Sequence, residues 1–321
     1  MMTAAVIEKT EQTEARDFGI RSVIVTGPTG AIGIALVSLL ASKGLEVCAV
    51  VNPESPRKDR IPKAENVRVV ECGLSEIAYL PEKPGIGKAD AFFHLAWAGT
   101  AGPGRNDIAL QNNNLRAALE AVEAAESLGC KVFVGTGSQA EYGRVSEPLR
   151  PEMPLRPENA YGIAKMRAEK MTRELCRSYG IRHVWPRILS VYGPYDNERA
   201  MIPNLIHALL RGERPKLTEG AQIWDYLFSE DAAKALYALS VHGKDGSAYP
   251  LGSGEKRPLR AYVEDLRDVV SPGAELGFGE IPYGDRQVMF LSADISAIQK
   301  DTGWRPETPF KEGIRKCLEA M

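Results

Sequence analysis

The sequence predicts an α/β protein with a doubly wound parallel sheet and a smaller C-terminal α/β lobe. Three observations support this fold class. Short apolar runs alternate with longer segments of helical periodicity over the first part of the 321 residues. A glycine-rich turn joins the first apolar run to the first helical segment. After Pro194 the pieces become shorter and richer in proline and glycine, which indicates a separate lobe.

The expected strands are short apolar runs, and strands of this kind between helices predict a parallel sheet covered on both faces. They are Ser22–Thr26, Glu46–Val51, Val67–Val70, Ala91–Ala96, Val132–Thr136 and His183–Ile188. The helical segments keep apolar residues at helical spacing. They are Ile32–Lys43, Asp107–Leu128 and Tyr161–Tyr179, with a returning helix at Leu227–Leu239 and a returning strand at Ala248–Leu251.

Composition and charge exclude several classes of protein. The net charge is −2 with both signs mixed, so no basic block indicates a nucleic-acid partner. No apolar run reaches the ~18 residues that a membrane span needs, and the polar first ~20 residues lack the apolar core of a signal peptide. The scattered cysteines 48, 72, 130, 176 and 317 predict reduced thiols, a cytoplasmic location and no metal site.

The turn after the first strand has the composition of a phosphate-binding loop. Gly27 permits a tight turn, Gly30 lets the backbone approach a pyrophosphate, and Gly33 lets helix and strand pack closely. The helix that follows presents unpaired N–H groups to phosphate. The turn therefore predicts a Rossmann-type dinucleotide site whose contacts come from Gly27, Thr29, Gly30, Ala31, Ile32 and Gly33.

The end of the second strand bears on which dinucleotide binds. An acidic residue there accepts hydrogen bonds from the adenosine ribose and repels a 2′-phosphate. The first polar residue is instead Asn52, and Ser55, Arg57 and Lys58 follow within reach of a 2′-phosphate. NADP(H) is favoured, with Asn52 and Arg57 as contacts. NAD(H) is the alternative, with Glu54 serving the ribose and Arg57 and Lys58 solvated.

A tyrosine and a lysine lie four residues apart, on one face of a predicted helix. A phenol titrates near pH ~10 unaided, and an ammonium beside it lowers its pKa. Tyr161 and Lys165 are therefore candidates for proton transfer. Ser138 ends the strand before that helix, where its hydroxyl can align a substrate oxygen beside the phenol, and Thr136 precedes it.

Together these motifs resemble the extended short-chain dehydrogenase/reductase family, in its nucleotide-sugar epimerase/dehydratase/4-ketoreductase branch. Thr26–Gly33 fits the family's T-G-x-x-G-x-x-G. His94–Trp97 resembles H-x-A-A/G, and Arg187–Pro194 resembles R-x-x-N-V-Y-G-P. Asp294–Ser296 and Gly303–Pro306 resemble the family's D-x-S-K and L-G-W-x-P. The resemblance covers nearly the whole chain from about Arg21 onward.

The composition predicts a division of the chain, and the resemblance implies a set of contacts. The polar residues 1–20 are expected to be a flexible extension, with a helical arm over Glu8–Asp17 as the alternative. Residues 21–190 form the NAD(P)-binding domain, with returning segments near 222–251, and 191–321 form mainly the substrate lobe. Further cofactor contacts are Leu95, Ala96, Trp97, Asn114, Thr136, Tyr161, Lys165 and Ile188. His94 is expected to be a core histidine, and a homodimer is expected to form through Asp107–Leu128 and Tyr161–Tyr179.

The substrate that the resemblance implies is a sugar joined to a nucleoside diphosphate. Its expected contacts are Trp97, Ser138, Gln139, Tyr161, Ser190 and Arg286, and the loop Gly99–Gly104 is expected to line the sugar pocket. Trp224 stands where an arginine often binds the diphosphate, so Arg286 is the preferred diphosphate contact. Arg211 and Arg214 are weaker candidates.

Departures from the family pattern reduce the number of candidate reactions. Gln139 and Ala140 stand where dehydratases carry an acid and a base, which argues against dehydration. Glu141 is expected to have a surface or structural role, with a displaced catalytic acid as the alternative. The favoured function is an NADPH-dependent 4-keto-6-deoxy-sugar reductase. The alternative is a 4-epimerase with tightly bound NAD. A remote third is a dinucleotide-sensing regulator, disfavoured because Tyr161 and Lys165 are both present.

Overall fold

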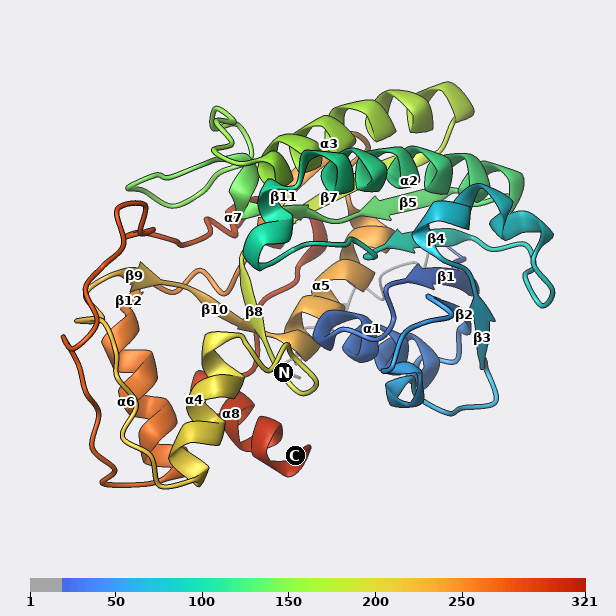
Figure 1. The fold of residues 1–321 in the computed structure, drawn as a ribbon. Helices are drawn as coiled ribbons and strands as arrows, with labels where there is room; N and C mark the ends of the chain where they lie inside the picture. Colours follow the sequence, from blue (N-terminus) through green and yellow to red (C-terminus); the bar gives the residue numbers. More distant parts are fainter. Residues whose placement is uncertain (1–18) are drawn as a thin grey trace, which may run out of the picture.

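The computed structural model describes residues 19–321 and has one parallel sheet at its centre (Figure 1). The strand order is β11-β7-β5-β4-β1-β2-β3, and β6 also pairs with β7. The strands are β1 (Ser22–Thr26), β2 (Glu46–Val51), β3 (Val67–Glu71), β4 (Ala91–His94), β5 (Val132–Gly135), β6 (Gly137–Ser138), β7 (Arg182–Ile188) and β11 (Ser247–Leu251). The order reverses direction between β1 and β4, so ligands are expected beyond their carboxyl ends.

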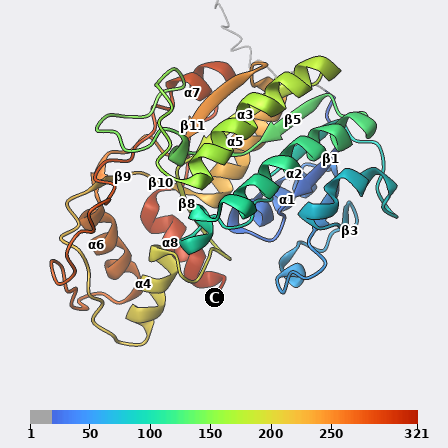
Figure 2. The same cartoon turned by 45° about the horizontal axis from the view of Figure 1, so that its top comes forward.

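Helices cover both faces of this sheet, as expected for a parallel sheet. Figures 1 and 2 show α2 (Ile108–Ser127) and α3 (Ala160–Tyr179) side by side over one face. The other face is covered by α1 (Ala31–Ser42) and α5 (Ser229–His242). Each face has its own apolar core, one around α1 and α5 and one around α2. The fold is therefore the predicted Rossmann-type α/β fold.

The smaller lobe gathers at the lower left of Figure 1 and has a separate aromatic core. Tyr192, Phe228, Tyr262 and Phe310 meet there at ring-centroid distances of 4.8–5.5 Å. Its helices are α4 (Met201–Leu210), α6 (Leu259–Val270) and α8 (Phe310–Glu319). The short helix α7 (Ser296–Thr302) instead packs on α5 and β11 of the main sheet. Its strand pairs are β8 (Ser190–Tyr192) with β10 (Tyr226–Phe228), and β9 (Ile223–Trp224) with β12 (Arg257–Pro258).

Most element boundaries agree with the prediction to within one residue, and the larger differences concern β4 and α5. The fourth strand ends at His94 rather than Ala96, because the backbone then turns to meet Thr26, whose Oγ1 accepts from the Ala96 N–H at 3.3 Å. The returning helix begins at Ser229 rather than Leu227, because the residues before it pair with β8 as a strand. The predicted extension and helical arm lie outside the described residues, apart from 19 and 20.

All five cysteines are free and buried. Burial raises the pKa of the Cys48 thiol to about 11 and that of Cys130 to about 12. No helix within residues 19–321 is long and apolar enough to cross a membrane. The same residues contain no cluster of three or more His, Cys, Asp or Glu side chains able to hold a metal ion.

Candidate active site

The glycine turn between β1 and α1 has the geometry that a phosphate loop needs. Gly27 has φ +71°, and a Cβ there would lie 2.8 Å from the Ala96 nitrogen. A Cβ on Gly33 would overlap the Gly27 carbonyl oxygen. A Cβ on Gly30 would meet no protein atom within 4 Å, so packing does not require glycine there. The turn lines a cavity of about 500 Å³, and this open space fits a dinucleotide pyrophosphate at the start of α1.

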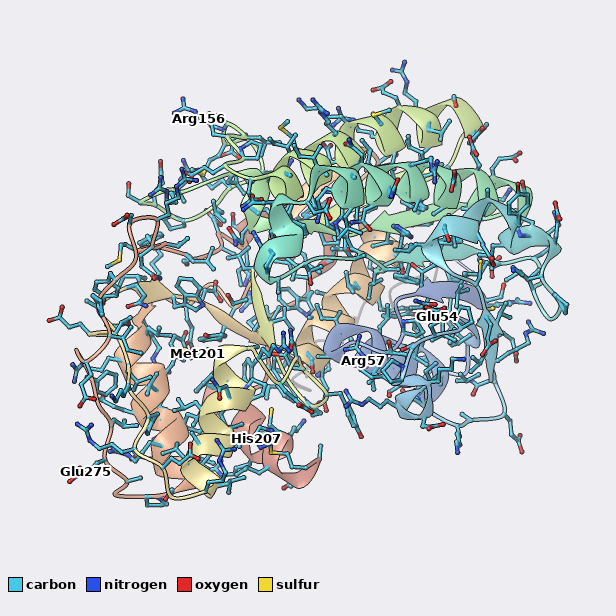
Figure 3. The ribbon with its side chains drawn as sticks, viewed as in Figure 1. Glu54, Arg57, Arg156, Met201, His207 and Glu275 are labelled. Carbon is cyan, nitrogen blue, oxygen red and sulfur yellow. The ribbon has the colours of Figure 1, made fainter. Side chains whose placement is uncertain are left out.

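The segment after β2 brings one guanidinium to this cavity. Arg57 lines it, and Figure 3 labels Arg57 and Glu54 in this segment. Lys58 is paired instead with Glu71. Asn52 is exposed and does not line the cavity, since its Oδ1 closes a local turn by accepting from the Glu54 N–H at 3.1 Å. Arg57 is thus the basic residue of this segment that faces the turn.

The chain after β4 is fixed by buried side chains. Asn114 on α2 donates to the Ala98 carbonyl at 2.9 Å and accepts from the Ala98 N–H at 3.0 Å. The Trp97 indole donates to Gln111 at 2.8 Å. His94 is buried and bonded to Thr26, and burial lowers its pKa to about 3, which agrees with a core histidine. Asn114 therefore shapes the wall of the cavity from behind and does not line it.

Ser138 and Tyr161 meet where β6 adjoins the start of α3. Asn159 caps α3 by accepting from the Gly162 N–H at 2.8 Å, which fixes the first turn that carries Tyr161. Burial raises the pKa of Tyr161, whereas a hydrogen bond from Ser138 and the charge of Arg105 lower it. Burial prevails, so the phenol stays protonated near neutral pH and is suited to donate a proton.

Lys165 lies on the same helix face as Tyr161, and its ammonium group is enclosed. Its Nζ donates to the Thr136 carbonyl at 2.6 Å and lies 3.7 Å from the Trp97 ring centroid and 5.9 Å from that of Tyr161. Burial lowers the pKa of Lys165 to about 7. The expected lowering of the Tyr161 pKa by this ammonium is wrong, because burial of the phenol raises that pKa and the charge that lowers it comes from Arg105 rather than Lys165.

A buried ion pair between Glu141 and Arg187 fixes the backbone of Ser138. Glu141 is fully buried and accepts from the Ser138 N–H at 2.8 Å, from Trp185 Nε1 at 3.2 Å and from Arg187 Nε at 2.7 Å. Burial raises the pKa of Glu141, while Arg187 lowers it. The expected surface role for Glu141 is wrong and the structural one is right, because the partner Arg187 lies on β7, distant in the sequence.

The predicted residues converge on two adjoining cavities. The turn cavity is lined by Gly27, Thr29, Gly30, Ala31, Ile32, Gly33, Arg57, Leu95, Ala96, Trp97, Thr136 and Ile188. The second, a cleft of about 480 Å³, is lined by Trp97, Thr136, Ser138, Gln139, Tyr161, Lys165, Ile188 and Ser190. Because the two cavities share several lining residues, they form one continuous site at the carboxyl ends of the parallel strands.

The predicted diphosphate contacts are dispersed. Arg286 does not line the cleft but a smaller adjoining cavity of about 220 Å³. Arg211 is exposed and paired with Glu213, and Arg214 is paired with Glu280. The Trp224 indole donates to the Ser190 hydroxyl at 3.0 Å, so Ser190 meets the cleft as a partner of that tryptophan.

The cleft also contains residues that the sequence did not single out. Arg105, Asp196, Met201 and Tyr226 line it, and Met201 lies at the first turn of α4 (Figure 3). Burial raises the pKa of Asp196 to about 6. For Arg105, the sequence offered one indication of a place in the cleft. It directly follows the glycine-rich loop that was expected to line the sugar pocket.

Comparisons with known proteins agree with this geometry. A family model described as the NAD dependent epimerase/dehydratase family matches residues 23–252. CDP-abequose synthase of Salmonella typhimurium is 27% identical over 93% of this chain and 98% of its own length. The structure of UDP-N-acetylglucosamine 4-epimerase from Methanobrevibacter ruminantium, at 24% identity, has a TM-score of 0.84 over 94% of this chain and 98% of that one. RMD of Pseudomonas aeruginosa, complexed with NADPH, is 23% identical, with a TM-score of 0.77 over 94% and 98%.

Proposed function

The chain belongs to the NAD-dependent epimerase/dehydratase family, and from this premise we propose that it is an NADPH-dependent reductase of a 4-keto-6-deoxy sugar joined to a nucleoside diphosphate. The observation that carries the proposal is one continuous site. Ser138, Tyr161 and Lys165 line a cleft that opens into the cavity of the glycine turn. Its full-length relative CDP-abequose synthase carries a nucleotide sugar in its name, which supports the substrate class.

Each residue has a role in this proposal. When bound, the nicotinamide dinucleotide supplies the hydride that reduces carbon 4 of the sugar. The Ser138 hydroxyl aligns the carbonyl oxygen, and the protonated Tyr161 phenol gives that oxygen its proton, so that the carbonyl becomes an alcohol. Lys165 lines the cleft next to Thr136 and Trp97, which border both cavities. From there it would hold the cofactor ribose and favour the phenolate that remains.

The preference for NADPH depends on Arg57. Its guanidinium faces the turn cavity, while its neighbour Lys58 is neutralised by Glu71. A guanidinium matches the oxygens of a 2′-phosphate in charge and shape. Arg57→Gln should therefore weaken NADPH binding and leave NADH binding unchanged, measured by fluorescence titration. Equal losses for both dinucleotides would contradict the assignment.

A nucleotide-sugar 4-epimerase with tightly bound NAD would use the same three residues, and it is the second candidate. It is favoured by Glu54, an exposed acid in the segment after β2 that can accept bonds from an adenosine ribose. The two functions differ in cofactor balance, because an epimerase returns the hydride to its substrate and a reductase consumes it.

The deciding experiment incubates the purified full-length protein with 4-keto-6-deoxy nucleotide sugars and with 4-hydroxy nucleotide sugars. We expect net oxidation of NADPH with a keto sugar; turnover of a hydroxy sugar without added cofactor would favour the epimerase. Tyr161→Phe should lower turnover about a hundredfold or more and keep NADPH binding. Tyr79→Phe, at an exposed position, is the control. Unchanged turnover in Tyr161→Phe would refute the mechanism.

A cytoplasmic homodimer stays a prediction. The face of α2 and α3 that points away from the sheet leaves Ile108, Ile163 and Met171 exposed, which is consistent with a partner there. Light scattering of the wild type and of Met171→Glu tests the dimer, since a charge in place of this exposed methionine should shift the protein toward monomer.

A further inference from the structure

Arg105 places a guanidinium in the cleft without a carboxylate partner. It lies in the 3₁₀ turn Gly102–Asn106, and its Cζ is 4.4 Å from the centroid of the Tyr161 ring. Its Nη1 donates to the Thr100 carbonyl at 3.0 Å, and no acidic side chain within residues 19–321 forms an ion pair with it. A guanidinium left unpaired in a cleft is suited to bind an anion, because carboxylate and phosphate oxygens match its donors.

The turn that carries Arg105 is held in place by the protein. Gln111 on α2 donates from Nε2 to the Gly99 carbonyl at 3.1 Å and to the Gly104 carbonyl at 2.8 Å. Gly99 has φ +66°, and a Cβ there would press against Leu110. The guanidinium is therefore presented from a fixed backbone, which lowers the entropic cost of binding.

Arg105 also borders the smaller cavity that contains Arg286. This cavity is lined by Arg105, Gln139, Arg144, Glu158 and Arg286, among others. Arg144 is neutralised there, because its Nε donates to both Glu158 oxygens at 3.0 and 2.9 Å. Arg286 is exposed and forms no ion pair within 4 Å with any residue of the described chain, although its charge contributes, after Arg144, to lowering the pKa of Glu158. The single acid is thus already engaged, and two unpaired guanidinium groups remain.

The cleft itself offers no other accessible cation among its described lining residues. Lys165 is 3% exposed and its ammonium is bound by the Thr136 carbonyl and the Trp97 ring. Asp196 also lines the cleft and is acidic. A negatively charged group entering the cleft is therefore drawn toward Arg105.

We propose that Arg105 binds an oxyanion of the substrate next to Tyr161, with Arg286 completing the site across the adjoining cavity. The inference rests on the proposed function and specifies the substrate further. Two sources share this chemistry, the diphosphate of the nucleotide and a carboxylate on the sugar ring. The diphosphate is compatible with the 6-deoxy sugar of the proposed function, whereas a carboxylate at carbon 6 would replace the 6-deoxy sugar by a uronic acid. In either case the charged group lies toward Arg105 and Gln139, and the reacting carbon lies at Tyr161.

The test measures binding rather than turnover, by calorimetry on the full-length protein. The probes are UDP, CDP, dTDP and GDP, together with UDP-glucose and UDP-glucuronic acid, which differ by one carboxylate. The variants are Arg105→Gln, Arg105→Lys and Arg286→Gln. Arg150→Gln is the control, because this half-buried arginine pairs with Glu147 and Glu152 outside both cavities.

If the diphosphate is the anion, Arg105→Gln should weaken binding of the best nucleoside diphosphate by about tenfold or more, and Arg286→Gln by less. If the carboxylate is the anion, only UDP-glucuronic acid should lose affinity. Arg105→Lys should lose less affinity than Arg105→Gln but should not match the wild type, since lysine keeps the charge but not the planar guanidinium. Undiminished binding of every probe by Arg105→Gln overturns the inference, as does a wild type that binds none of them.

NADPH binding to the same variants separates this inference from the proposed function. Arg105 does not line the turn cavity, so Arg105→Gln should bind NADPH like the wild type. Failure of the wild type to oxidise NADPH with any keto sugar would refute the proposed reductase, while the calorimetric comparison would still report on Arg105.

Discussion

The buried pair of Glu141 and Arg187 gives the most quantitative prediction. Glu141→Ala removes a fully buried carboxylate that accepts three hydrogen bonds and leaves Arg187, itself 4% exposed, without its counter-charge. The Tyr142 hydroxyl and the Pro151 carbonyl remain as its acceptors. Breaking a buried pair from one side costs about 3–5 kcal/mol. This is a large part of the ~5–15 kcal/mol by which a typical protein is stable.

Urea denaturation followed by circular dichroism measures this loss as a lower midpoint at an unchanged slope. Glu158→Ala is the matched control, because it removes an exposed partner of Arg144 and should cost only ~0–1 kcal/mol. Replacing Glu141 and Arg187 together by methionine should recover much of the loss, since no buried charge is then left unpaired. A Glu141→Ala protein within about 1 kcal/mol of the wild type would refute the reasoning.

Three further predictions concern the site. As the pH rises from 7 to 9, the wild type should gain stability relative to Lys165→Met. The reason is that the folded protein releases the Lys165 proton near pH 7, whereas the unfolded chain keeps it to about 10.4. Urea midpoints of both proteins at the two pH values check this, and a midpoint difference that does not change with pH would contradict it. Gly33→Ala should cost about 1–3 kcal/mol through overlap with the Gly27 carbonyl, seen as a lower melting temperature without ligand. Gly30→Ala should leave that melting temperature unchanged but weaken NADPH binding, because its methyl group meets only the open cavity.

The strands of the sheet were predictable because their sequences are distinctive. Ser22–Thr26 and Glu46–Val51 have the predicted bounds, since each is a short apolar run with a polar residue or a turn on either side. The end of β4 was not predictable. Residues 95–98 are as apolar as a strand, but the backbone leaves the sheet to bond with Thr26 and Asn114. These partners lie on other elements, so nothing in the local sequence marks the boundary.

The residues of the site likewise fall into those that the sequence predicted and those that it did not. Tyr161 and Lys165 were predicted from their spacing on one helix together with the preceding strand end at Ser138 and the glycine turn, since the spacing alone is common in helices. The glycine turn was predicted from its place between strand and helix. Arg105 and Glu141 were not, because charged residues are common and their roles depend on neighbours far along the chain. Glu141 depends on Arg187, 46 residues later. Arg286 shows the converse, since a suitable residue type faces an adjoining cavity rather than the cleft.

The burial of every native thiol makes the chain convenient for site-directed labelling. Maleimide dyes react with thiolates, and all five cysteines are both shielded and held as thiols by their raised pKa values. A cysteine introduced at exposed Asn106, on the turn that carries Arg105, would therefore react far faster than the native ones. A dye at that position would sense ligand arrival at the rim of the cleft without removal of any natural cysteine.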